Sequence, residues 1–584
     1  MYLGRPFRTF VGETPALHCD KIDCMSERLS RRQFIKDAAV VTTGFVVGSA
    51  TQVYAAPSFD LVIKNGTILD GTGGAAFRAD LGVKADEIIA IGNISPEQSK
   101  SVIDASGLHV CPGFVDIHSH SDGSILSYLD SESRVLQGVT TELTGNCGSS
   151  AAPMTGKGVE ERKKSWLEQE DVRVDWSDVA SYFGRLEKEK ISINQALLLG
   201  QGTLRESLIG NVDRALKDDE LKTILRWVEE GMDQGAVGIS TGLEYTPGRY
   251  TPTQEIVEMA RIASRRGGLY ASHIRNEEAT LLEAVNEAVN IGRQSGGRVE
   301  VSHLKAAGVV NWPKQLGAIH LLESARQNGV EVLADAYPYT AYSTGLTVYL
   351  KSWALEGTTA DLMKRLKDPE TRARMRSELV AHIPTEPGSF DLIVVSSVPS
   401  EKNRFTIGKN LSEIGESWKM EAVDAMLRLM EEEEGNVSIV GHGMSPENVR
   451  MVLSHPLVMI GSDGLTMAPR GKLGQSRPHP RSYGTYPRVL GYYSREQKIF
   501  DLPTAVKKMT SMPADQMGMR DRGRIAKSMK ADLVLFNAAT VKDVATFEEP
   551  HRYPVGIEYI IVNGVLTAEH GKHNGARAGR VLRS

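Results

Sequence analysis

The sequence predicts an α/β protein in which a large domain of alternating strands and helices carries a small domain built only of strands. Two observations support this. Between residues 111 and 515, short apolar segments alternate with longer segments of helical periodicity, a pattern typical of parallel βα units. On both sides of that region, short strand-like segments alternate with glycine-rich turns. We therefore expect a TIM-type (β/α)8 barrel at 111–515, plus a small β-sandwich domain in which 57–110 pairs with 516–584.

Eight candidate strands account for the barrel. They cover residues 110–117, 139–144, 195–199, 237–240, 269–272, 299–302, 330–334 and 457–460. Helices are expected at 218–234, 253–266, 277–292 and 314–328. The chain between the last two strands is too long for one βα unit, so about 344–435 should be an insertion. Such an insertion can form a lid over a site at the carboxyl ends of the strands.

Residues 1–56 resemble an export signal. Arg31 and Arg32 precede an apolar run at 38–50 and a small-x-small pattern that ends at Ala55. This combination resembles a bacterial twin-arginine signal. The run is shorter than the roughly 20 residues that cross a bilayer, so no stable membrane insertion is expected. We predict export by the twin-arginine machinery, removal of the signal near Ala55 and a periplasmic mature protein. The alternative is a cytoplasmic protein with an amphipathic tail.

The start of the chain needs a separate interpretation. Twin arginines normally lie close to the initiator, and Met25 would place them so. We therefore interpret Met25 as the true start and residues 1–24 as a start-site artefact.

The charge distribution limits the classes of partner. The net charge is −5 and the two signs are interspersed, so the chain has no basic stripe for nucleic acid or an anionic membrane surface. A small-molecule substrate is the expected partner.

Six side chains at predicted strand ends suggest a metal site: His118, His120, Cys147, His273, His303 and Asp463. His118 and His120 are two residues apart and so share one face of an extended segment. Imidazole nitrogen, thiolate and carboxylate are the ligands that zinc takes in proteins. Asp463 can also accept a proton from an activated water and return it to a leaving group. Each residue has a structural alternative: a hydrogen-bonded histidine, a packed loop thiol, a helix cap. Their joint occurrence at strand ends favours the metal site.

The motifs around these residues resemble a known family. They are PGFVDIHSH at 112–120, NCG at 146–148, STGLEY at 240–245, SHIR at 272–275, SHLK at 302–305 and GSDG at 461–464. They look like the amidohydrolase superfamily, and within it the D-aminoacylase (N-acyl-D-amino-acid deacylase) family, over residues 59–571. In many superfamily members a carboxylated lysine bridges two metals. This family has a cysteine there, and Cys147 occupies the corresponding position.

The resemblance implies roles for the ligands. Cys147, His273 and His303 would hold one tightly bound Zn²⁺. His118, His120 and Asp463 would form a possible second, weaker site, with Asp463 as the acid/base. It also implies that four residues bind the carboxylate of the substrate: Lys305, Tyr337, Ser343 and Arg481. The structural alternatives for these four are a core position for Tyr337 and a surface position for Arg481.

These features lead to a primary hypothesis and three alternatives. The primary one is zinc-dependent hydrolysis of the amide bond of N-acyl-D-amino acids, in which the preference for the D-hand rests on the resemblance alone. A dipeptidase for dipeptides with a C-terminal D-residue is the nearest alternative. A cyclic amide hydrolase is more remote, because a bridging lysine is expected where Cys147 stands. A non-catalytic metal-binding protein should have lost the acid/base residue, yet Asp463 is present.

Overall fold

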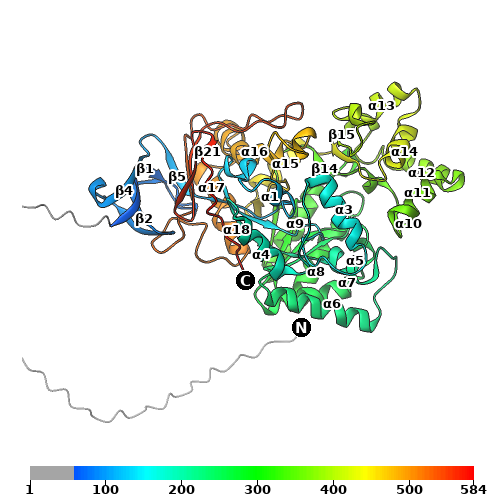
Figure 1. The fold of residues 1–584 in the computed structure, drawn as a ribbon, viewed down its shortest axis with the longest axis horizontal. Coiled ribbons are helices and arrows are strands. Elements are labelled where there is room, and N and C mark those ends of the chain that lie inside the picture. Colours follow the sequence, from blue (N-terminus) through cyan, green and yellow to red (C-terminus); the bar gives the residue numbers. More distant parts are fainter. Residues whose placement is uncertain (1–57) are drawn as a thin grey trace, which may run out of the picture. The chain divides into compact units, whose positions relative to one another are not determined.

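The computed structural model describes residues 58–584 (Figure 1). The expected export signal and the cleavage position near Ala55 lie outside these residues. Within the described part of the chain, no helix is both long and apolar enough to span a membrane.

Strands from both ends of the described chain form one mixed sheet. Its order is β21-β20-β19-β18-β5-β1-β2-β3, and β4 also pairs with β1. The strands are β1 (Phe59–Ile68), β2 (Phe77–Lys84), β3 (Glu87–Gly92), β4 (Ser99–Asp104), β5 (His109–Pro112), β18 (Leu533–Phe536), β19 (Ile557–Val562), β20 (Val565–Glu569) and β21 (Lys572–His573). The two ends meet where β18 runs antiparallel to β5. A sandwich of two sheets was expected. Instead all nine strands are hydrogen-bonded into one sheet, because the first half of β1 pairs with β4 and its end pairs with β5.

The larger domain contains parallel strands in two hydrogen-bonded groups. One has the order β6-β7-β8 and the other β17-β13-β12-β11-β10-β9. Their bounds are β6 (Phe114–Asp116), β7 (Val139–Thr144), β8 (Asn194–Leu197), β9 (Leu199–Gly200), β10 (Gly238–Gly242), β11 (Leu269–His273), β12 (Arg298–Val301), β13 (Val332–Ala336) and β17 (Val458–Ile460). Only Leu198 separates β8 from β9, so the two are parts of one extended segment. A parallel bridge between Ser119 and Gly464 joins the ends of β6 and β17. The strands therefore follow one another in a cyclic order.

Helices connect these strands or follow the last of them. They include α5 (Gln201–Ile209), α6 (Asp218–Asp233), α7 (Thr253–Arg265), α8 (Leu281–Ser295), α9 (Lys314–Gln327), α15 (Pro446–Ser454) and α17 (Leu502–Met509). The sequence predicted α6, α7 and α9 within one residue, but α8 begins four residues later than expected. The cause is local: the side chain of Asn276 accepts hydrogen bonds from the backbone N–H groups of Glu278 and Thr280, which holds this segment in a turn.

A separate lobe lies between β13 and β17, where the sequence predicted an insertion. Its three-stranded antiparallel sheet has the order β14-β16-β15, with β14 (Tyr342–Gly345), β15 (Ile393–Ser397) and β16 (Ser438–Gly441). Its helices are α10 (Ser352–Leu355), α11 (Thr359–Lys367), α12 (Pro369–His382), α13 (Leu411–Trp418) and α14 (Ala422–Glu432), drawn in yellow-green in Figure 1. The lobe has its own apolar core, which includes Leu346, Ile393 and Met426. We refer to residues 342–441 as the insertion.

Candidate active site and metal centre

The six candidate ligands lie at the carboxyl ends of the parallel strands. His118 and His120 follow β6, Cys147 follows β7, His273 ends β11, His303 follows β12 and Asp463 follows β17. Three of them have left-handed backbone angles without being glycine: φ is 51° at Cys147, 35° at His303 and 52° at Asp463. Such conformations are sparsely populated and cluster at functional sites, where the surrounding structure enforces them.

Cys147 is the centre of one group of donor atoms. Its Sγ lies 3.3 Å from Nε2 of His118 and 3.4 Å from Nε2 of His303. Burial by itself raises the pKa of the thiol, but positive charge on His118 and His303 outweighs burial and holds the pKa well below its usual range. The thiolate is the form of cysteine that binds metal. His118 and His303 can therefore share one cation with Cys147.

Asp463 belongs to a second group. Its Oδ1 lies 3.0 Å from Nε2 of His120 and 3.6 Å from Nε2 of His118, and its Oδ2 lies 2.8 Å from Nη1 of Arg481. Burial opposes ionisation, but Arg481 and the histidines outweigh it, so the pKa of Asp463 lies well below its usual range. Asp463 is thus held as a carboxylate that can accept a proton. His118 takes part in both groups.

His273, which the resemblance implied as a ligand of one zinc together with Cys147 and His303, lies beside these groups. It forms a donor group with Glu277 and His303. Its Nε2 lies 3.0 Å from Oε2 of Glu244, while its Nδ1 is buried and has no hydrogen-bond partner among the described residues. A buried polar atom without a partner is costly, so this free nitrogen fits a residue that completes its coordination with a metal.

Carboxylates behind the ligands fix the imidazole rings. Asp335, which is fully buried on β13, places Oδ2 3.2 Å from Nδ1 of His118 and so leaves Nε2 of that ring free to face Cys147. Glu277 places Oε1 2.8 Å from Nδ1 of His303. Carboxylates in this position set the tautomer of a metal-binding histidine. Sequence reasoning missed these roles, because the partners lie far from the histidines in the chain.

Glu300 lies deeper in the same region. It is fully buried on β12, and neither carboxylate oxygen has a hydrogen-bond partner among residues 58–584. Burial, followed by repulsion from Asp335, raises the pKa of Glu300 well above its usual value. These surroundings favour the neutral form of Glu300 beneath the His118–Asp335 pair.

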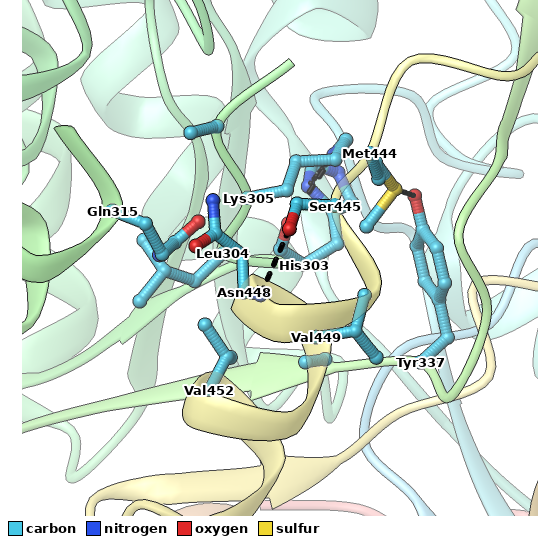
Figure 2. Close-up of a pocket in the computed structure, with 12 residues that line it drawn as sticks. His303, Leu304, Lys305, Gln315, Tyr337, Met444, Ser445, Asn448, Val449 and Val452 are labelled. Atoms are coloured by element: carbon cyan, nitrogen blue, oxygen red, sulfur yellow. Dashed lines mark hydrogen bonds between the residues drawn. The ribbon is translucent and has the colours of Figure 1, made fainter. Parts of the chain in front are cut away.

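Lys305 faces the metal ligands. Its Nζ lies 2.6 Å from Oε1 of Glu277 and 2.9 Å from Nδ1 of His303, and the residue is 5% exposed. The side chain expected to bind a substrate carboxylate is therefore already engaged in an ion pair. It also borders a small cavity together with His303 and Tyr337 (Figure 2).

The remaining predicted substrate residues lie close to Asp463. Arg481 donates through Nη2 to the backbone oxygen of Ser343 at 3.4 Å, and its Cζ lies 4.9 Å from the centre of the Tyr337 ring. Burial raises the pKa of Tyr337 to about 12, so its hydroxyl stays protonated. Figure 2 shows this hydroxyl directed toward Met444, at 3.8 Å from Sδ.

His479 positions Arg481. Its ring is buried, its Nε2 lies 2.9 Å from the backbone oxygen of Ala341, and its Nδ1 accepts a hydrogen bond from the backbone N–H of Arg481. Burial, followed by repulsion from Arg481, holds its pKa well below its usual value. A neutral histidine with Nε2 protonated satisfies both contacts.

A cavity of about 350 Å³ opens beside the metal ligands. His120, Cys147 and Asp463 line one end of it, together with Ser343 and Arg481. Its lining also includes Arg162 of α3 (Val159–Glu170) and Glu206, which the sequence gave no reason to select. Arg162 lies 3.6 Å from Glu206 through Nε, and its Nε and Nη1 have no hydrogen-bond partner in the described part of the chain. The cavity is thus wide enough for an organic substrate, and both the metal ligands and other charged side chains line it.

Comparison with known proteins identifies a family and several similar sequences. A model described as the amidohydrolase family matches residues 101–377 and 425–568. A D-aminoacylase of Alcaligenes xylosoxydans xylosoxydans is 36% identical over 525 residues, which is 90% of this chain and 97% of that protein. An N-acyl-D-glutamate deacylase of the same organism is 34% identical over 90% of this chain and 96% of that protein.

Solved structures of deacylases are also similar to this chain. The structure of N-acyl-D-glutamate deacylase from Bordetella bronchiseptica, complexed with zinc and a phosphonate that mimics the tetrahedral intermediate of the reaction, superposes with a TM-score of 0.76. It is 32% identical and is matched over 90% of this chain and 100% of that chain. A D-aminoacylase structure described as having a binuclear metal centre gives the same TM-score at 33% identity, with the same shares of the two chains covered.

Proposed function

This chain belongs to the amidohydrolase family, and from that premise we propose that it hydrolyses N-acyl-D-amino acids to a carboxylate and a free D-amino acid. It is an enzyme that acts on amide bonds. The observation that carries the proposal is the convergence of His118, His120, Cys147, His303 and Asp463 at the strand ends of a chain 36% identical to a D-aminoacylase. We interpret the cyclic order of parallel strands as the expected (β/α)8 barrel, whose active site lies at this end.

The donor set fits zinc. Thiolate, imidazole and carboxylate are zinc ligands, and Nδ1 of His273 is free to join them. We propose one tight zinc held by Cys147, His273 and His303, and a second, weaker position at His118, His120 and Asp463. His118 lies close enough to Cys147 and His303 to reach the first position as well. Bound zinc supplies an activated water and polarises the acyl carbonyl.

The protein groups supply positioning and proton transfer. Asp463 takes a proton from the attacking water and returns it to the leaving nitrogen. His120 and Arg481 hold one oxygen of Asp463 each, which fixes the direction of that transfer. Arg481, beside Ser343 and the protonated hydroxyl of Tyr337, is placed to bind the substrate carboxylate.

The test is hydrolysis of paired N-acetyl-D- and N-acetyl-L-amino acids by the zinc-loaded mature protein. We expect turnover of the D-forms and its loss in Asp463→Ala. Turnover of the L-forms alone would overturn the stereochemical assignment. If no acetyl compound is hydrolysed but dipeptides that end in a D-residue are cleaved, the enzyme is a dipeptidase and not a deacylase.

The metal assignment has its own test. Cys147→Ser should lose the tight zinc, measured as bound zinc per protein chain after dialysis against a weak chelator. Retention of one equivalent of zinc in Cys147→Ser would contradict the assignment.

We further propose that the protein reaches the periplasm by the twin-arginine route and loses its signal near Ala55. Residues Arg31 and Arg32 support this proposal. Replacing both by lysine should leave the full-length protein in the cytoplasm, as detected by cell fractionation. Unchanged export of that variant would contradict the route.

A further inference from the structure

Glu300 lies in the interior of the barrel, behind the metal ligands. In the parallel register it pairs with Ala271 on β11 and Leu333 on β13. Both belong to or pack against an apolar cluster to which β6, β7, β8, β11 and β17 also contribute, as expected for the inside of a barrel. Paired residues of a parallel sheet point to the same face, so Glu300 points inward too. Asp335, two residues after Leu333 on β13, shares that face.

The carboxyl groups of Glu300 and Asp335 meet without a donor between them. Both residues are fully buried. One side-chain oxygen of each lies within 4.8 Å of the other and of a ring nitrogen of His118. Among residues 58–584, no side chain or backbone group donates a hydrogen bond to either oxygen of Glu300 or to Oδ1 of Asp335. Because ionised carboxylates only accept hydrogen bonds, a proton on one of the two groups is needed to satisfy these oxygens.

The surroundings place that proton on Glu300. Asp335 has a partner for its negative charge, since its Oδ2 lies 3.2 Å from Nδ1 of His118. Burial, followed by repulsion from Asp335 and a hydrogen bond with it, raises the pKa of Glu300 well above its usual value. Burial also opposes ionisation of Asp335, but His118 and the hydrogen bond with Glu300 outweigh it and lower the pKa of Asp335. Two carboxyl groups that share a site divide in this way, one neutral and one ionised.

Gly461 encloses the free oxygen of Asp335 from another side. A Cβ at this position would lie 2.8 Å from Oδ1 of Asp335 and 2.9 Å from Cβ of His118, so only glycine leaves room for the carboxylate. The backbone N–H of Gly461 donates to the backbone oxygen of Ala336 and is not available to Asp335. Glu300 is therefore the group placed to satisfy Oδ1.

We propose that Glu300 is a positioning residue of the metal site, which donates a hydrogen bond from its carboxylic acid to Oδ1 of Asp335. Hydrogen bonds from a hydroxyl to a carboxylate are short and strong. Since the other oxygen of Asp335 contacts His118, a donor on Oδ1 holds the carboxylate at both oxygens and prevents its rotation. Glu300 thus acts on the metal only through Asp335 and His118. This inference rests on the proposed zinc site and adds a residue to its support.

Two substitutions separate the hydrogen bond from the charge. Glu300→Gln keeps a donor and can never be ionised, so it should bind zinc like the wild type. Glu300→Leu suits the apolar neighbours but removes the donor, and it should weaken zinc binding about 10-fold, as loss of a group that supports a metal ligand does. Competition with a chromophoric chelator measures both affinities. Thr140→Val removes another buried hydroxyl without a partner among the described residues, on β7, and is the control with wild-type affinity.

A double-mutant cycle tests whether Glu300 acts through Asp335. In the Asp335→Asn background, Glu300→Leu should cause no further loss of zinc affinity, because the contact that it supports is already gone. Losses that add in the double variant would overturn the proposed route, and wild-type affinity in Glu300→Leu would refute the role altogether.

Glu300→Gln remains decisive even if Glu300→Leu does not fold. A 10-fold loss of zinc affinity in Glu300→Gln would mean that Glu300 acts as an anion, which contradicts the proposal. An additional equivalent of bound zinc that only Glu300→Gln lacks would assign Glu300, Asp335 and His118 to a metal position instead. Wild-type protein that binds no zinc at all would refute the proposed metal site itself, and this inference with it.

Discussion

The two walls of the active site differ in how their polar groups are satisfied. On the barrel wall, three histidines each have a carboxylate behind them: Asp335 for His118, Glu277 for His303 and Glu244 for His273. On the insertion wall, Glu278, from the turn after β11, and Glu386 of the insertion each lie 3.9 Å from Nε2 of His382, beyond hydrogen-bond distance. The barrel wall is thus organised in advance for metal and proton transfer, because its rings cannot turn without breaking these contacts.

The insertion wall is organised differently. His382 and Glu386 lie in residues 378–424, which the amidohydrolase family model does not match. Glu278, by contrast, lies in the matched part, so the cavity between the metal ligands and the insertion is lined by both parts of the chain. Substitutions at the metal ligands and their supporting carboxylates should change metal affinity and kcat, whereas substitutions inside the insertion should mainly change the stability of the fold.

The largest effect is expected at Asp463. In Asp463→Asn the amide cannot accept a proton, so kcat should fall by about 10²- to 10⁴-fold. Steady-state kinetics on an N-acetyl-D-amino acid measure the loss, and metal analysis should show that the zinc at Cys147 remains. A kcat within a few-fold of the wild type would show that another group transfers the proton.

The second-largest effect is expected at Asp335, the carboxylate that contacts the ring of the metal ligand His118. Asp335→Asn should weaken metal binding by about 10- to 100-fold, because His118 loses the carboxylate that orients its ring. Competition with a chromophoric chelator measures the affinity. Asp424→Asn, on a surface carboxylate of the insertion, is the control and should bind metal like the wild type. Equal affinities in the two variants would remove the proposed distinction between the walls.

The barrel wall could be predicted largely from the sequence because its signals are local. The segment 139–144 consists of two apolar residues, three threonines and Glu142 between glycines, and β7 occupies Val139–Thr144 as predicted. His118, Cys147, His303 and Asp463 directly follow such segments, so parallel strand ends bring them together.

Two of the supporting carboxylates, Asp335 and Glu277, could not be predicted in this way. Asp335 meets His118 across 217 residues, and only the pairing of β13 with β17 and the bridge from β17 to β6 bring the two together. Glu277 was assigned to a helix, but the turn at Asn276 keeps it out of α8 and directs it to His303. The small sheet of the insertion likewise pairs β14 with β16, which lie far apart in the chain.

A smaller effect is expected at Arg481, which contacts the acid/base residue Asp463 and is also placed to bind the substrate carboxylate. Arg481→Lys keeps the charge but loses the planar pair of donors that matches a carboxylate. We expect KM for N-acetyl-D-amino acids to rise about 10-fold, and the preference for these substrates over their C-terminal amides to shrink equally. If KM rises without a change in that preference, Arg481 acts only through its contact with Asp463.

The smallest effect is expected at Tyr342, a buried residue of the insertion. Its hydroxyl donates to Glu386 and lies 2.8 Å from the hydroxyl of Tyr349, so Tyr342→Phe leaves both partners without a hydrogen bond in a buried position. The free energy of unfolding should fall by about 1–3 kcal/mol, as measured by denaturant titration. Tyr559→Phe, which removes a hydroxyl that makes an exposed contact with His570, is the control and should change stability little. Because Tyr342 supports only the insertion wall, zinc affinity should stay at the wild-type value. A loss of zinc in this variant would mean that the insertion also holds the metal ligands in place.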